Sequence, residues 1–382
     1  IGYGTARTRD LTGSISSLKT EDLQKSKGVS FMDALQGRVA GVRVTSSSGE
    51  PGAGLDISIR GSNSINAGTQ PLYIIDDVQI DINPNEIATH SYTSSSVQYN
   101  PLASINPSDI LSIEVLKDAS ATAIFGSRGA NGVIIVTTKQ GMKGKTTVDF
   151  DAGFGVSSAT KTLKVLQGQD FANYRFAKSP YDTWGVDTDG DNVPDTPRDV
   201  SDLESHNWQD EVLRNAISQN YNIGIMGGTD KTRFTANFGY LNQEGIVIKN
   251  GYERYTVRVK ADTDLNSKLT LGANINFSNA ITNGAVTTSG NQAYNGLIQY
   301  FILYRPVILP DEPDEMGNPE NGGMTNPITF LNDAYKSIPS SRTMIDGYLR
   351  YKLTNNLSLR VSAASTMTHS KGEEWYPRTT SW

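Results

Sequence analysis

The residues best suited to chemistry lie in one acidic stretch near the middle of the 382-residue chain. Carboxylates alternate along it at short spacing, and calcium binds such clusters of hard oxygen atoms. Carboxylates packed this closely repel one another when no cation lies between them. The sequence therefore predicts a calcium site, with a merely solvated acidic loop as the alternative. The predicted ligands are Asp187, Asp189, Asp191, the backbone carbonyl of Val193, and Asp195.

The order of these residues is D-x-D-G-D-x-x-x-D, which is similar to the calcium loops of extracellular repeat proteins more than to an EF-hand. Asn192 stands where such loops prefer glycine, and no glutamate occupies the twelfth position. We expect Ca²⁺ to rigidify this loop.

Residues for catalysis are not grouped in any known pattern. His90, His206 and His369 stand in unrelated loop-like contexts, and the motifs of serine hydrolases, zinc proteases and P-loop proteins are missing from the sequence. Cysteine is absent, so the chain has no disulfide, thiolate nucleophile or cysteine-ligated metal. We therefore expect that the protein is not an enzyme and that it uses no organic cofactor.

Composition excludes two further classes. Only 37% of the residues are apolar, and no run of about 18 apolar residues occurs that could form a transmembrane helix. The net charge of -6 does not favour binding to nucleic acid. A membrane β-barrel stays possible, because its strands alternate apolar and polar residues and so keep the average hydropathy low.

After residue 146 the sequence alternates with a period of two. Between 268 and 277, for example, Leu269, Leu271 and Ile275 share one face, and polar residues occupy the other. Segments of about 9–11 residues with this pattern have the length of membrane-spanning strands. The predicted strands are residues 148–156, 219–226, 231–241, 253–261, 268–277, 343–353 and 357–365.

The connections between these strands are short and long in turn, as in outer-membrane barrels, where the long loops lie outside the cell. A soluble sandwich or propeller is the alternative. Seven strands cannot close a bacterial barrel, which has an even number, so we expect the chain to hold only the first part of one. Basic residues on the polar faces would then line the lumen and pair with carboxylates. These residues are Arg233, Arg254, Arg258, Lys260 and Lys268.

The part before residue 142 is predicted to be a small α+β unit. Apolar runs at 112–116 and 132–138 read as strands, and the small residues between them at 119–125 read as a short helix. Asn106 fits a helix N-cap, with Pro107 in the first helical position. Further strands are expected at 12–18, 42–45, 55–60 and 72–76, a helix capped by Ser30, and a surface loop at 81–99.

Four pieces of this unit carry a resemblance to a known family: LQGRVAGVRVTS (35–46), SIRG (58–61), PLYIIDDV (71–78) and the run from SIEVLKDASATAIFGSRGANG to residue 141. In this order they resemble the SusC/RagA family of TonB-dependent outer-membrane transporters of Bacteroidota. The resemblance implies an α+β plug domain inside a large antiparallel transmembrane β-barrel of about 22 strands. Residues 1–9 would be a flexible segment, 10–141 the plug, and 142–382 the first part of the barrel.

The resemblance also implies a function. It implies import of oligosaccharides or peptides through the cell outer membrane, driven by TonB, with a SusD-like lipoprotein as a lid. The segment that binds TonB would lie upstream of Ile1. Rival interpretations are a receptor for a chelated metal or a vitamin, and a secreted β-rich glycan-binding protein.

Ligand contacts are implied for the plug loops at 62–70 and 81–99, whose amides and rings suit sugar hydroxyls or a peptide backbone. The residues so implied are Asn63, Asn66, Gln70, His90, Tyr92 and Tyr99. Arg60 is expected to pair with an acid, because a buried guanidinium needs a partner. The family usually has D-G-V where this chain has Asp76, Asp77 and Val78, which puts the shape of that turn in question.

Overall fold

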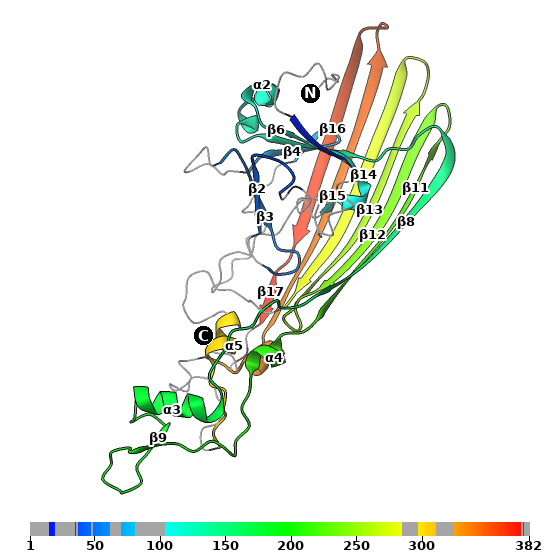
Figure 1. Ribbon diagram of the computed structural model, residues 1–382. Coiled ribbons are helices and arrows are strands. Elements are labelled where there is room, and N and C mark those ends of the chain that lie inside the picture. Colours follow the sequence, from blue (N-terminus) through cyan, green and yellow to red (C-terminus); the bar gives the residue numbers. More distant parts are fainter. Residues whose placement is uncertain are drawn as a thin grey trace.

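The computed structural model describes residues 15–19, 35, 37–46, 49–61, 70–80, 104–284, 297–310, 324–375 and 377. A small mixed sheet from the first third of the chain lies against the concave face of one large antiparallel sheet (Figure 1). We call the first the plug sheet and the second the wall.

The plug sheet has five strands in the order β1-β6-β7-β4-β5. β4 runs parallel to β7, and the other neighbours are antiparallel. All four residues of β4 are buried, as expected for a strand covered on both faces. A separate hairpin, β2–β3, adds Val44, Ile57 and Ile59 to the main apolar core. The strands are β1 (Ile15–Lys19), β2 (Val42–Ser46), β3 (Leu55–Ile59), β4 (Leu72–Ile75), β5 (Val78–Ile80), β6 (Ile110–Leu116) and β7 (Val133–Thr138).

Two short helical segments flank β6. The predicted cap is confirmed, because the side chain of Asn106 accepts a hydrogen bond from the Ser108 N–H, but it begins a single 3-10 turn, η4 (Pro107–Asp109). The predicted helix after β6 is α2 (Ala119–Thr122), which continues as the 3-10 segment η5 (Ala123–Gly129) and kinks at Gly126. The helix predicted after Ser30 and the loop at 81–99 lie outside the described residues.

The wall contains all seven strands predicted from alternation, in the order β16-β15-β14-β13-β12-β11-β8. All seven are longer than predicted, since alternation marks only the part that faces an apolar phase. β15 begins eight residues earlier than expected, where polar residues occupy both faces. The strands are β8 (Gly144–Ser157), β11 (Ala216–Gly228), β12 (Thr232–Glu244), β13 (Gly251–Asp264), β14 (Leu269–Asn283), β15 (Tyr335–Lys352) and β16 (Ser358–Ser370); β17 (Glu373–Trp375) pairs with β15.

The two faces of the wall have opposite chemistry. In β13, Arg254, Thr256 and Arg258 are buried toward the plug, whereas Val257 and Val259 are exposed on the convex face. A soluble sheet would bury the apolar face. The convex face therefore suits contact with lipid, and the polar face lines a lumen.

The connections also divide by side. Short turns join β11 to β12, β13 to β14 and β15 to β16 at one end, and the long connections project from the other (Figure 1). Residues from both long connections share an apolar core, in which Trp208 and Val212 join Leu297, Tyr300 and Phe330. None of the described helices has the length and hydropathy to cross a membrane. The projection contains α3 (Gly168–Lys178), β9 (Gly185–Val186), β10 (Thr196–Pro197), α4 (Trp208–Val212), α5 (Leu297–Leu303) and α6 (Pro327–Asp333).

Candidate functional site

The turn between β4 and β5 consists of two aspartates. Asp76 has φ 47° and Asp77 has φ 72°, and positive φ at both central residues is the mark of a type I′ hairpin turn. The second position of such turns strongly favours glycine, but aspartate tolerates the left-handed conformation better than most residues. The turn therefore keeps the backbone of an Asp-Gly turn and carries an additional carboxylate.

Asp76 joins the plug to the wall. Its carboxylate lies 2.9 Å from a guanidinium nitrogen of Arg258 and 3.2 Å from Nζ of Lys260, and the three side chains are 2–9% exposed. The backbone N–H and the hydroxyl of Thr138 in β7 donate hydrogen bonds to the same carboxylate. The expected pairing of lumen cations with plug carboxylates is confirmed here.

The partners of Asp76 keep its carboxylate ionised. Burial favours the neutral acid, but the charges of Lys260 and Arg258 and the two hydrogen bonds from Thr138 outweigh it and keep the pKa of Asp76 below its usual range. A buried carboxylate with two buried cations is a contact that is costly to break on one side only.

The other predicted lumen cations have different surroundings. Arg233 lies 3.9 Å from Asp264 of the wall itself. Arg254 is buried, and Lys268 is exposed in the short turn before β14.

A second contact between plug and wall is formed by η4. The side chain of Asn106 donates to Oδ1 of Asn222 in β11, and Asn222 donates in turn to the hydroxyl of Ser108 at 3.1 Å. Gly239 of β12 makes this approach possible, since a Cβ there would lie 2.2 Å from Nδ2 of Asn106. A methyl group there would displace these side-chain ends, so close approach favours glycine at this position without any unusual backbone angle.

A cavity of about 400 Å³ lies beside this contact and is lined by Asp109, Lys139, Asp149, Asn222 and Asn237, among others. Asp109 is 6% exposed. Its burial raises the pKa to about 6, against the opposing charges of Arg258, Lys139 and Arg254. The charge of this carboxyl group thus changes in the mildly acidic range.

The structure places only one of the six residues expected to bind ligand. Gln70 lies in the plug and donates from Nε2 to Asp56 at 2.6 Å, and its backbone carbonyl accepts from Asn131 at 3.3 Å. Its role in ligand binding stays a prediction. Asn63, Asn66, His90, Tyr92 and Tyr99 lie outside the described residues.

Arg60 forms the expected ion pair, and its partner is Asp118 before α2. The Arg60 side chain is 53% exposed, so the expectation that it is buried is wrong. Arg60 directly follows β3 and has φ 58°.

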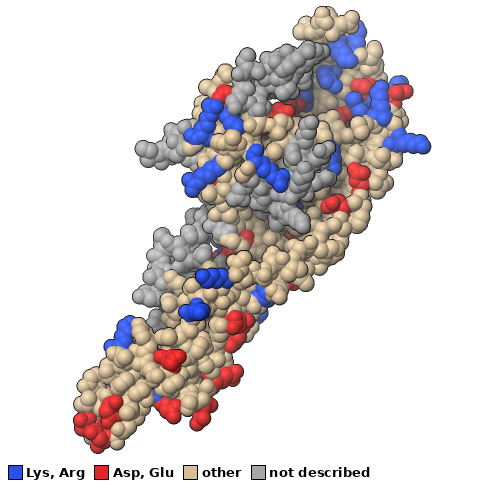
Figure 2. All heavy atoms as spheres, viewed as in Figure 1, with Lys and Arg blue, Asp and Glu red and all other residues tan. Residues whose placement is uncertain are grey.

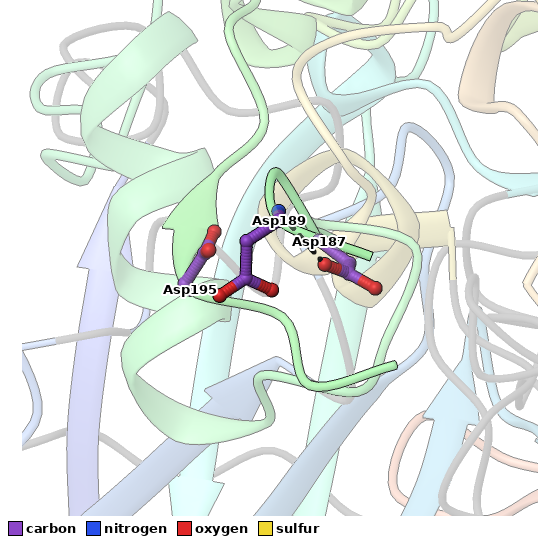
Figure 3. Close-up of side chains that lie close together, drawn as sticks. All are labelled: Asp187, Asp189 and Asp195. Carbon is purple, nitrogen blue, oxygen red and sulfur yellow. Dashed lines mark hydrogen bonds between the residues drawn. The ribbon is translucent and has the colours of Figure 1, made fainter. Parts of the chain in front are cut away.

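The acidic loop follows β9 in the projection. Carboxylate oxygens of Asp187, Asp189 and Asp195 lie within 4.8 Å of one another (Figure 3), whereas the carboxylate of Asp191 is not in this group. Asp187 accepts backbone N–H bonds from Gly190, Asn192 and Asp189, which hold its pKa below the usual range. Asn192 takes the left-handed conformation, φ 64°, that glycine would supply.

This loop lies far from the plug. Figure 2 shows acidic side chains gathered at the end of the projection, where Figure 1 places β9. Three of the five predicted ligands are close enough together to share one cation. Calcium binding by this loop stays a prediction.

Comparison with known proteins agrees with this architecture. Residues 7–133 match the family model of the TonB-dependent receptor plug domain. TonB-dependent receptor SusC of Bacteroides thetaiotaomicron is 36% identical over 283 residues, which are 73% of this chain and 26% of the relative. TonB-dependent receptor P39 of Formosa agariphila is 30% identical over 383 residues, covering 100% of this chain and 33% of the relative. The chain thus spans about a quarter to a third of the length of these relatives.

Solved structures show the same arrangement. The RagAB peptide importer in its open-open state superposes with a TM-score of 0.77 and 26% identity, over 98% of this chain and 42% of that chain. The ferric citrate transporter FecA has a TM-score of 0.58 at 12% identity and so shares the fold alone.

A plug sheet held by ion pairs against the polar face of a partial barrel wall, together with these matches, defines a TonB-dependent receptor, a protein of the outer membrane. Within that class, the chain belongs to the SusC/RagA family of TonB-dependent outer-membrane transporters. The relatives reported above are receptors and transporters by name.

Proposed function

We propose that the full-length protein imports oligosaccharides or peptides across the outer membrane. The observation that carries the proposal is the plug docked inside the wall through Asp76, Arg258 and Lys260. A plug that fills a lumen must move before cargo passes. The ion pairs and hydrogen bonds of this contact lie beside an apolar contact of Met344 with the plug core, and they can be broken locally and made again, which suits a gate.

TonB would supply the force, acting on a segment upstream of the plug. The topology supports a pull from that side, because β1 is the edge strand of the plug sheet and pairs only with β6 among the described strands. The Asp76 contact lies near the opposite edge, in the turn between β4 and β5.

A SusD-like lipoprotein is the proposed partner at the outer end. The two long connections fold together there on a shared core of Trp208, Tyr300 and Phe330, and so offer a preformed surface rather than separate loose loops. The related RagAB complex is described as a peptide importer, whereas the cargo of this protein is proposed only as oligosaccharide or peptide.

The test is purification of the full-length protein from native outer membranes in detergent, followed by mass spectrometry of proteins and small molecules that remain bound. We expect a SusD-like lipoprotein and a retained glycan or peptide. Retention of a metal chelate or a vitamin instead would favour the rival receptor function. Membership of a family of outer-membrane proteins rules out a secreted glycan-binding protein.

A further inference from the structure

Two arginines of the wall face each other directly on the lumen side. Arg350 of β15 and Arg360 of β16 are register partners in the antiparallel pair, so their Cβ atoms are about 5 Å apart. Like charges directly opposite one another destabilise a sheet. Such a pair is stabilised when an anion lies between or beside the two guanidinium groups.

A carboxylate of the protein itself lies beside one of these two guanidinium groups. Asp77, the additional carboxylate of the β4–β5 turn, accepts a hydrogen bond from Nη1 of Arg360 at 2.6 Å. Arg350 has no such partner for its Nε, which is buried without a hydrogen bond within the described part of the chain. Asp77 is the carboxylate bonded to Arg360, whereas Arg350 interacts electrostatically with Asp264 of the wall without a hydrogen bond to its Nε.

The site has a fixed platform. The ring of Tyr348 lies close to both arginines, with its centroid 4.2 Å from Cζ of Arg360 and 5.9 Å from Cζ of Arg350. The Tyr348 hydroxyl donates to Asp262 at 2.6 Å, which holds the ring in place. A cation stacked on an aromatic face keeps its N–H edge available for an anion.

Nearby wall carboxylates already have other partners. Asp262 accepts from Tyr348, and Asp264 accepts from the hydroxyl of Thr270 at 2.7 Å and lies 3.9 Å from Arg233. Among the described residues, the carboxylate bonded to Arg360 is thus Asp77 of the plug, and its departure leaves the Arg360 guanidinium open to another anion.

We propose that Arg350, Arg360 and Tyr348 form an anion-binding site on the lumen wall, which Asp77 occupies while the plug is docked and which takes a carboxylate of the cargo when the β4–β5 turn moves away. This inference rests on the proposed import function. Guanidinium groups bind carboxylates through two parallel hydrogen bonds, so the cargo class that fits is a short oligomer with carboxylate groups.

The test uses the full-length protein in detergent and the variant Asp77→Gly, which restores the glycine favoured at φ 72° and so keeps the turn. An arginine-selective dicarbonyl reagent labels exposed guanidinium groups, and mass spectrometry reports labelling at Arg350 and Arg360 separately. We expect labelling of Arg360 to rise roughly fivefold in Asp77→Gly, since a partly exposed ion pair contributes up to about that factor. Sodium sulfate at fixed ionic strength should reverse the rise.

Two controls make the result specific. Labelling of Arg198 in the projection should be the same in both proteins and with both salts, and Arg360→Gln in the Asp77→Gly background should abolish sulfate protection of Arg350. Unchanged Arg360 labelling in Asp77→Gly, or a rise that sulfate does not reverse, would overturn the site.

The source of the carboxylate is distinguished by two probes, triglutamate and trigalacturonate, each added in place of sulfate. Protection by the first indicates an acidic peptide, and protection by the second an acidic oligosaccharide. Protection by sulfate but by neither oligomer would overturn the assignment to cargo. Failure of import as a whole would leave the labelling result intact, because labelling requires no transport.

Discussion

Asp76→Asn is the change that tests the plug contact most directly. Asparagine keeps the volume of the side chain and tolerates the left-handed backbone at φ 47°, so the turn itself should remain. The substitution removes the counter-charge of Arg258 and Lys260, which are 2% and 9% exposed. Removing one partner of a buried ion pair costs about 3–5 kcal/mol, because the remaining charge stays buried without compensation.

The expected effect is a lower free energy for local opening of the plug sheet. Each 1.4 kcal/mol is about tenfold in an equilibrium constant, so the opening equilibrium should rise by at least about 100-fold. Hydrogen–deuterium exchange of the full-length protein measures this in peptides that cover β4 and β7, where the Thr138 N–H donates directly to Asp76.

The matched control is Asp56→Asn. Asp56 is an exposed plug aspartate whose carboxylate accepts from Gln70, and an amide oxygen can accept the same bond. Its effect on exchange in β4 and β7 should stay within about 0.5 kcal/mol. Acceleration of less than about tenfold in Asp76→Asn, with the wall strands unchanged, would refute the argument that this ion pair holds the plug.

Three further predictions concern other parts of the molecule. Since the folded state raises the pKa of Asp109 to about 6, ionisation costs stability at neutral pH, and the cost is relieved as pH falls from about 6 to 4. Asp109→Asn should therefore stabilise the plug at pH 8 by up to about 3 kcal/mol. It should also reduce the change in plug stability between pH 4 and pH 6, as measured by hydrogen–deuterium exchange. A loss of stability at pH 8 would contradict this. Gly239→Ala places a methyl group 2.2 Å from Nδ2 of Asn106 and should speed exchange at η4, whereas Gly251→Ala, whose Cβ would lie at an ordinary contact distance of 3.5 Å from the Gln243 carbonyl oxygen, should not. Calcium should slow proteolysis of the loop at 187–195, and Asp189→Asn should remove the effect; protection that magnesium supplies equally, or that survives in Asp189→Asn, would count against a calcium site.

The strands and their faces could be predicted from sequence because they depend on local pattern. Alternation over 253–261 is enough to place Arg258 and Val257 on opposite faces. It also predicts that cations line the lumen, since the other face must meet lipid. The cap at Asn106 is local as well, because the side chain bonds to a backbone N–H two residues away.

Strand ends and small strands were harder to predict. β5 has three residues and was missed, because its pattern is too short to show alternation. The first eight residues of β15 were missed because polar residues on both faces leave no periodic signal.

The pairing of particular residues was decided only by tertiary structure. Asp76 and Arg258 are 182 positions apart, and the local sequence around either residue does not indicate that the two side chains pair. The sequence by itself determined which residues carry charge and which strand face they occupy. Only the docking of plug against wall brought Asp76 to Arg258 and Asp77 to Arg360, since burial turns a possible ion pair into a required one by removing water as the alternative partner.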